Sequence, residues 1–223
     1  MKQKKEVFAE GVCLQKALWV FLIGSVFGVV METIISYFQY GAFESRKGLI
    51  YGPLNPVYGF GAVIFMIFLV RYKNPLKVFF GGMLLGGGFE YLCSIIQEKV
   101  FGTTSWDYSG HAFNIGGRTS LFVMICWGLI ALLFVFIIYP PISKQIEKMP
   151  VRIGKTLSII LTIFLLADCA ISITACLRQS ERAKGIAPSN QMEVFLDKHY
   201  PDKRLNAIFE NAKRQKGCVK KSV

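Results

Sequence analysis

Three acidic residues lie inside apolar stretches of this sequence, and their types and positions make them the first candidates for chemistry. Glu32, Glu90 and Asp168 each interrupt a run of apolar residues. Glu98 lies at the end of its run, where its side chain can reach the interface. A charge at the centre of a membrane helix costs about 2.5–3.5 kcal/mol on insertion scales, so such residues usually face the interior of a bundle. The pattern predicts a polar site enclosed by helices.

Two arginines are the candidate partners of these acids. Arg46 and Arg118 each stand where a polar loop approaches the start of an apolar run. Intramembrane acids commonly pair with a cation or accept hydrogen bonds inside the bundle. We therefore predict that Glu90 pairs with one of the two loop arginines.

The loop TTSWDYSGHAFNIGGRTSL (103–121) supplies further polar groups. Asp107 and Asn114, together with Arg118, are the groups that we expect to face the site. Trp106 and Tyr108 suit the aromatic belt at the boundary between lipid and water, whatever else they do.

The segment LIYGPLNPVYGFG (49–61) concentrates helix-breaking residues in front of an apolar run, and includes Pro53, Asn55 and Tyr58. Irregular backbone at membrane depth is tolerated only where it is buried in protein or lines a cavity. One interpretation is a broken helix that brings backbone groups near the glutamates, as transporters use to hold a polar ligand. The alternative is a tight turn whose glycines allow close helix packing.

The elements that position these residues are apolar helices. Hydrophobic residues make up 53% of the 223-residue chain and charged residues only 18%, which is typical of a membrane protein. Four apolar runs have nearly the 20 residues that a spanning helix needs, and the second run is shorter. We predict an all-α polytopic bundle of about five transmembrane helices, from the runs 17–38, 57–70, 78–96, 121–138 and 157–177.

A short internal repeat links two of the acids. The sequences GVVME (28–32) and GGGFE (86–90) share the pattern G-x-x-x-E, and each is followed by a polar loop with an arginine and by another apolar run. Two related hairpins running in the same direction would place both glutamates at similar depth and both loops on one face.

The basic residues of the chain lie between and beyond its apolar runs. Lys and Arg number 26 against 14 Asp and Glu, a net charge of +12, and they gather in the loops and tails, as membrane-surface charges do. We expect no nucleic-acid partner. The positive-inside rule favours a cytoplasmic N-terminus. Five spans then place the C-terminal tail on the opposite side, although its basic character argues against this.

These observations divide the chain into a basic N-terminal segment (1–16), a transmembrane domain (17–177) and a basic C-terminal tail (178–223). In the tail, residues 189–200 and 201–217 each place apolar residues at helical spacing. Such helices can lie on an anionic leaflet or pack on a loop. The cysteines and histidines lack ligand spacing, so we expect no metal and no other cofactor.

The motifs together resemble the putative ABC-transporter type IV family of bacterial integral membrane proteins. The resemblance rests on GSVFGVVMETIISYF (24–38), SRKGLIYGPLNPVYGFGA (45–62) and FEYLCSIIQEKVFGTTSWDYSGHAFNIGGRTSLFVMICWG (89–128). Lys47, between Arg46 and Gly48, is a departure from the R-G of the family. The motif residues are Glu32, Arg46, Gly52, Pro53, Pro56, Tyr58, Gly59, Gly61, Glu90, Tyr91, Glu98, Trp106, Asp107, Tyr108, Asn114, Gly117, Arg118, Trp127 and Gly128, and Asp168 resembles an acidic residue of the family's last span.

The resemblance implies a multi-pass permease component in the cell membrane, surrounded by lipids, whose ATPase is a separate chain and which can form homo-oligomers. Its substrate-binding residues would be the acids, arginines and loop residues named above. One alternative is a membrane-embedded enzyme that acts on a lipid or isoprenoid head group, with the same acids as general acid and base and the arginines as a phosphate clamp. Another is an accessory membrane protein, in which the Glu–Arg pairs are purely structural.

Overall fold

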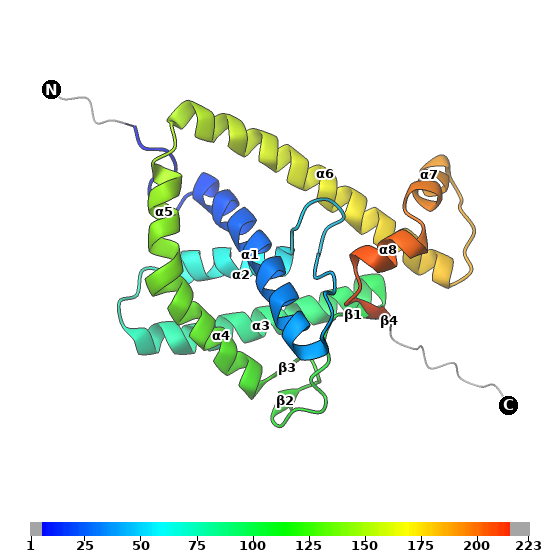
Figure 1. Cartoon of the computed structure of the whole chain (residues 1–223), viewed down its shortest axis with the longest axis horizontal. Helices are drawn as coiled ribbons and strands as arrows, with labels where there is room; N and C mark the ends of the chain where they lie inside the picture. Colours follow the sequence, from blue (N-terminus) through cyan, green and yellow to red (C-terminus); the bar gives the residue numbers. More distant parts are fainter. Residues whose placement is uncertain (1–5, 215–223) are drawn as a thin grey trace.

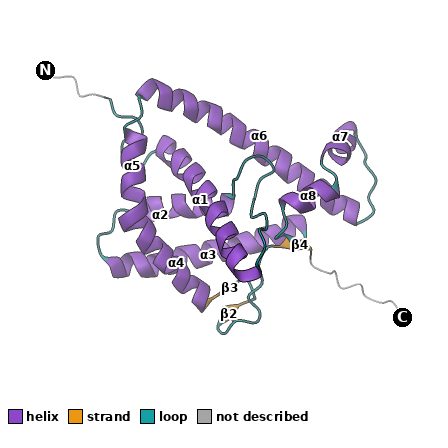
Figure 2. Ribbon diagram, in the orientation of Figure 1, coloured by secondary structure: helices purple, strands orange, loops and turns teal. Residues whose placement is uncertain are grey.

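The computed structural model describes residues 6–214, so the outermost parts of the predicted N-terminal segment and tail lie outside the described residues. Long helices dominate the fold (Figures 1 and 2): α1 (Leu14–Tyr40), α3 (Pro75–Phe101) and α6 (Val151–Ala183). A fourth long helix consists of α4 (Leu121–Leu133), the π-helical turn η1 (Phe134–Ile138) and α5 (Tyr139–Glu147).

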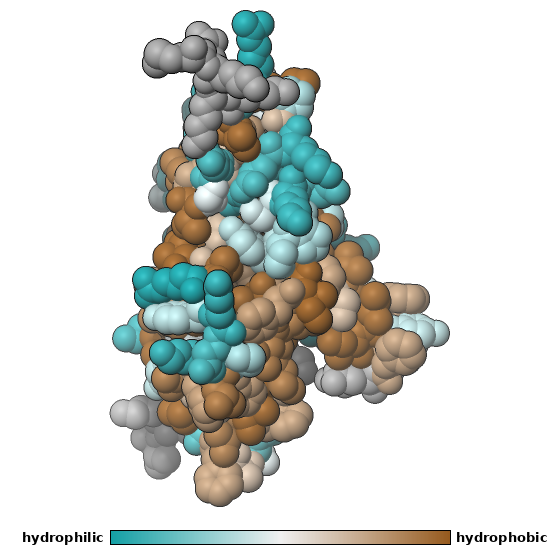
Figure 3. Space-filling view, turned by 90° about the vertical axis from the view of Figure 1, so that its left-hand side faces the viewer, coloured by the Kyte–Doolittle hydropathy of each residue, from teal (hydrophilic) through white to brown (hydrophobic). Residues whose placement is uncertain are grey.

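These four helices are long and apolar enough to cross a membrane. The second predicted span is the shorter helix α2 (Pro56–Phe68). Large apolar side chains such as Phe80, Ile163 and Leu166 lie exposed on the outside of the helices. Figure 3 shows broad apolar areas on one face of the molecule. The prediction of an all-α membrane bundle is confirmed, with four full-length candidate spans and a shorter helix at the second run, which was expected to be short.

Glycines allow the helices to pack as two antiparallel hairpins, α1 with α2 and α3 with α4. A Cβ atom built on Gly28 of α1 would lie 2.2 Å from Cγ of Tyr58 in α2. A Cβ atom on Gly86 of α3 would lie 2.6 Å from Cβ of Trp127 in α4. Only glycine fits at such distances, so the close-packing role expected of the glycines is present in both hairpins.

The Gly/Pro segment forms a buried loop that leads into α2. Leu49, Ile50 and Leu54 are each at most 5% exposed, and backbone hydrogen bonds from Gly48 and Leu49 to the Leu54 carbonyl close the loop. The loop is held against α6, because the Ile50 amide donates to Ser172 Oγ at 2.9 Å. The apolar residues of this irregular segment are thus buried in protein, while its tip, residues 51–53, is exposed.

The start of α2 follows from residue types. Asn55 is the N-cap, and its side chain accepts a hydrogen bond from the Val57 amide at 3.1 Å. Pro56 occupies the first helical position, where its missing N–H costs nothing. The Asn55 side-chain amide also donates to the carbonyl of Arg46 at 3.2 Å, which ties the helix start to the preceding loop.

The tail is folded against the end of α6. Its elements are α7 (Gln191–His199), α8 (Asp202–Ile208) and β4 (Lys213–Arg214). Leu196 and Leu205 are buried in a cluster with Ile50 of the Gly/Pro loop. Strand β4 pairs antiparallel with β1 (Thr103–Thr104). The tail helices therefore pack on the Gly/Pro loop, and their contact with an anionic leaflet stays a prediction.

The connections between helices gather at two ends of the bundle. At one end, the N-terminal segment contacts the α5–α6 region, since Lys16 Nζ bonds Glu147 Oε1 at 2.6 Å and Lys155 Nζ bonds Glu6 Oε1 at 2.9 Å. At the other end, which we call the loop end, residues 41–55 and 102–120 meet the tail. Figure 1 shows the tail helices beside the far end of α6. The tail therefore lies at the end of the bundle opposite the N-terminal segment (Figure 1), and the side of the membrane that each end faces stays a prediction.

We predict that Gly86→Val destabilises the bundle by about 1–3 kcal/mol, because the new side chain must displace the Trp127 ring. Gly88→Val on the same helix is the matched control, since a Cβ atom there meets nothing within 4 Å. Thermal unfolding in detergent measures both variants. Equal losses of stability would contradict the packing described here.

A second prediction concerns the tail. Hydrogen bonds from Arg178, together with those from Arg182, hold the pKa of the Asp197 carboxyl below its ordinary value. The stabilisation is therefore fully present above the unfolded pKa of about 3.9 and is lost as the pH falls through the lower folded value.

At neutral pH, Asp197→Asn should accordingly loosen the tail and speed cleavage of the 184–190 connection by a protease of broad specificity. Lys198→Gln, an exposed change on the same helix, should leave the cleavage rate unchanged. A tail that is equally protected in all three proteins would show that the Asp197 ion pairs do not hold it.

Candidate functional site

Glu90 is buried on α3 and accepts hydrogen bonds from three neutral donors. Tyr108 donates to Oε1 at 2.9 Å, and Thr119 and Trp127 donate to Oε2 at 3.1 and 3.4 Å. The residue is only 7% exposed, and within residues 6–214 it forms no ion pair. The prediction that Glu90 pairs with a loop arginine is therefore wrong.

Arg118 binds further along the same helix. One terminal nitrogen donates to Ser94 Oγ at 3.1 Å and the other bonds Glu98. Ser94 and Glu98 follow Glu90 by one and two helical turns on α3, so they lie nearer the loop from which Arg118 comes. The Trp106 indole donates to the Arg118 carbonyl at 3.0 Å and fixes this part of the loop.

Arg46 has an equivalent arrangement in the first hairpin. Its Nη2 donates to Ser36 Oγ at 2.9 Å and to Glu44 Oε2 at 2.8 Å. Ser36 and Ser94 each lie four residues after a repeat glutamate, so the shared pattern is G-x-x-x-E-x-x-x-S at 28–36 and 86–94. Sequence reasoning found the glycine and the glutamate but missed the serine, which a longer comparison of the two segments reveals.

Glu32 faces the second helix of its hairpin. The Asn55 side-chain amide donates to its Oε2 at 3.5 Å, and the Tyr58 hydroxyl interacts electrostatically with the same carboxylate. Tyr58 in turn stands 6.3 Å from Trp127, measured between ring centroids, and it interacts electrostatically with Tyr108 and with Glu90. The two hairpins thus meet in a group of polar residues that we call the glutamate cluster: Glu32, Asn55, Tyr58, Glu90 and Tyr108.

Tyr108 reaches the cluster from the second loop. Burial and the nearby Glu90 carboxylate raise the pKa of its hydroxyl well above the ordinary value, so it remains a protonated donor at neutral pH. Its role is more specific than the boundary position expected of it, because its hydroxyl binds Glu90 directly.

Two other predicted site residues hold the loop together. Asp107 accepts hydrogen bonds from the side chain and the backbone amide of Ser109, which lower the pKa of its carboxyl. Asn114, in strand β2 (Asn114–Ile115), donates to the His111 carbonyl at 2.9 Å, and β2 pairs with β3 (Thr119–Ser120). Both side chains were expected to face the site, and the polar contacts that they make close turns within the loop itself.

Asp168 anchors the Gly/Pro loop instead of joining the glutamate cluster. Its Oδ1 accepts from the Tyr51 amide and from Ser172 Oγ, both at 3.1 Å. Its Oδ2 is buried and has no hydrogen-bond partner in the described part of the chain. Pro53 lies exposed in the same loop, where it helps to shape the turn.

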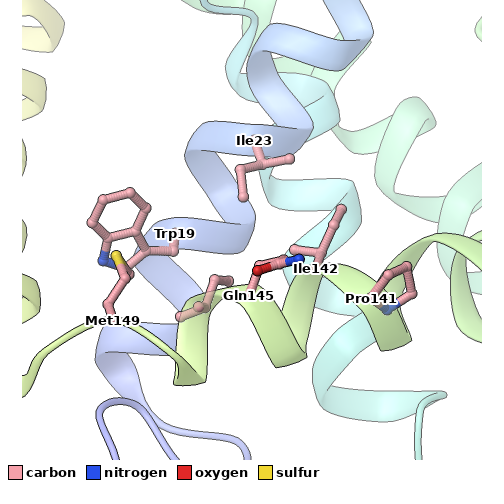
Figure 4. A pocket seen from close by; sticks show the side chains of 7 residues that line it. Trp19, Ile23, Pro141, Ile142, Gln145 and Met149 are labelled. Carbon is pink, nitrogen blue, oxygen red and sulfur yellow. The ribbon is translucent and has the colours of Figure 1, made fainter.

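Two cavities lie elsewhere. One, of about 320 Å³, is apolar and opens between α1 and α5; Figure 4 shows Trp19, Ile142 and Met149 around it. The Trp19 indole N–H bonds Ser158 Oγ of α6 at 3.0 Å. The other, of about 350 Å³, is bounded by residues 43–47, α1 and α8, and we call it the Arg46 cavity. Neither was predicted from the sequence, because each depends on how distant segments pack.

Comparison with known proteins identifies a family. A family model described as putative ABC-transporter type IV matches residues 19–173, more than half of the chain. The matched region contains both hairpins and Asp168 and excludes the tail helices α7 and α8. No curated protein and no solved structure matches the chain.

The arginine pairing is testable by a double-mutant cycle. Arg118→Gln combined with Glu98→Gln should show a coupling free energy of about 0.5–1 kcal/mol, because the ion pair is only partly exposed. Arg118→Gln combined with Glu44→Gln, the acid of the other hairpin, should be additive. Chemical unfolding in detergent supplies the free energies, and no coupling between Arg118 and Glu98 would contradict the pairing.

Proposed function

The chain belongs to the family described as putative ABC-transporter type IV, and from this premise we propose that it is the permease component of a transporter whose substrate path runs past the glutamate cluster. Its apolar helices agree with a multi-pass membrane protein. We place it in the cell membrane as part of the proposal.

One observation carries this proposal: two hairpins contribute a carboxylate each to one polar cluster, and the hydrogen-bond donors to Glu90 are neutral. An acid neutralised by an arginine has little capacity left for a ligand. Glu90 instead accepts hydrogen bonds from Tyr108, Thr119 and Trp127, and within the described residues no cation pairs with its carboxylate. Intramembrane ionisable residues in such settings commonly mark substrate or ion pathways.

The start of α2 supports the same assignment. The irregular segment before Pro56 presents Asn55 to Glu32, and the first turn of α2 presents Tyr58. Helices that begin at membrane depth are used by transporters to expose backbone and side-chain polar groups to a ligand. In our proposal this segment forms one wall of the path, and the Tyr108 loop forms another.

The proposal requires a source of energy. The described chain consists of membrane helices, two polar loops and a short helical tail, so we propose that a separate ATPase chain drives transport. We propose that this partner binds at the end of the bundle opposite the loop end, where the basic N-terminal segment lies.

The proposal predicts the result of purifying the tagged protein from its native membranes in a mild detergent, followed by mass spectrometry. We expect a stoichiometric ATPase subunit with the wild-type protein and also with Glu32→Gln/Glu90→Gln, because these changes lie within the bundle. The double variant should nevertheless lose the growth phenotype of the wild-type gene, whereas Glu44→Gln should keep it.

A lone protein that turns over a lipid head group in the absence of any partner would contradict the proposal and favour the membrane-enzyme interpretation. A double variant that retains full function would remove the glutamate cluster from the path.

A further inference from the structure

We propose that the Arg46 cavity binds a phosphate group, carried by a lipid head group or free in solution, through Arg46 and Lys47. The cavity measures about 350 Å³ and lies at the loop end between α1, the 43–47 segment and α8. The inference does not depend on the transport proposal, because no residue of the glutamate cluster lines this cavity.

The first argument is the state of the Arg46 guanidinium. The side chain is 13% exposed, and within residues 6–214 its hydrogen bonds are made by Nη2, to Ser36 and Glu44. The Nε atom is buried and has no partner among the residues that the structure describes. Because this atom is enclosed by protein, a ligand in the cavity would reach Arg46 through the part of its side chain that remains exposed, and the planar N–H groups of a guanidinium suit phosphate oxygens.

The second argument is the adjacent Lys47. Its half-buried side chain lines the same cavity and forms no ion pair within residues 6–214. Glu44 is the one acid among the lining residues, and it already accepts from Arg46. Arg46 also interacts with Glu32 of α1, so Lys47 is the lining cation that remains to favour an anion.

The third argument is the rest of the lining. Val29 and Phe43 provide apolar surface, and Thr33 adds a hydroxyl group. A phosphate attached to an apolar body would satisfy both kinds of surface at once, so we expect a phospholipid to bind more tightly than inorganic phosphate. The position at the end of the apolar part of α1 places the cavity where lipid head groups lie.

The tail completes the cavity. Ala207 and Ile208 of α8 form its outer wall. This wall is held in place by Ser45, whose hydroxyl donates to the Ile208 carbonyl at 2.6 Å. Any ligand in the cavity would therefore contact both the 43–47 segment and the tail.

The test uses the full-length protein purified in detergent and phosphate-free buffer, with binding followed by calorimetry. The probes are a short-chain phosphatidic acid, the matching diacylglycerol and inorganic phosphate. We expect phosphatidic acid to bind and diacylglycerol not to bind. Binding by inorganic phosphate as well would identify the phosphate alone as sufficient, whereas its absence would identify the source as a lipid.

Three variants test whether the ligand binds in the Arg46 cavity. Lys47→Gln should weaken phosphatidic acid binding about tenfold, as expected for the loss of one charge-assisted contact. Ala207→Trp should abolish binding by filling the cavity. Lys99→Gln, an exposed change at the end of α3, should leave binding unchanged. Failure of phosphatidic acid to bind, or equal binding by the wild type, Lys47→Gln and Ala207→Trp, would overturn the proposal.

Discussion

Contact between a glycine and an aromatic ring determines the geometry of both hairpins. Gly28 lies against Tyr58, and Gly86 lies against Trp127, at distances that exclude any Cβ atom. A glutamate follows each glycine by one helical turn on the same face. The ring that packs on the glycine therefore also presents its polar edge to the carboxylate. Close packing and the solvation of a buried acid are thus achieved by the same pair of helices.

Within residues 6–214, Arg46 and Arg118 form ion pairs with Glu44 and Glu98 and not, as their charge suggests, with the glutamates of the repeat. Each is bound one turn beyond its glutamate by a serine, and each pairs with an acid close to the loop end. The cations are thereby held toward the loops, and Glu90 is left with neutral donors. In our proposal this leaves Glu90 available to a ligand on the transport path, whereas Glu32 still interacts with Arg46.

Much of the fold could be predicted from the sequence, because apolar runs and the G-x-x-x-E repeat encode helices and their faces. The hydrogen-bond partners of Glu90 could not be predicted in this way. Spacing along the sequence gives the depth of Arg118, but it does not say which turn of α3 its side chain contacts. Asp107 and Asn114 looked available because their contacts with Ser109 and His111 depend on turns of the loop. The anchoring role of Asp168 depends on contact with a segment more than a hundred residues away, at Tyr51.

The central claim is that the glutamates of the two hairpins share one polar path. Cysteine accessibility tests it directly: Glu32→Cys and Glu90→Cys are introduced separately, in protein whose native cysteines are replaced, and are treated with a small water-soluble thiol reagent in oriented vesicles. The account predicts that both react from the same side of the membrane, while Phe80→Cys, on an apolar exposed face, does not react. Reaction from opposite sides, or at only one of the two positions, would contradict a shared path.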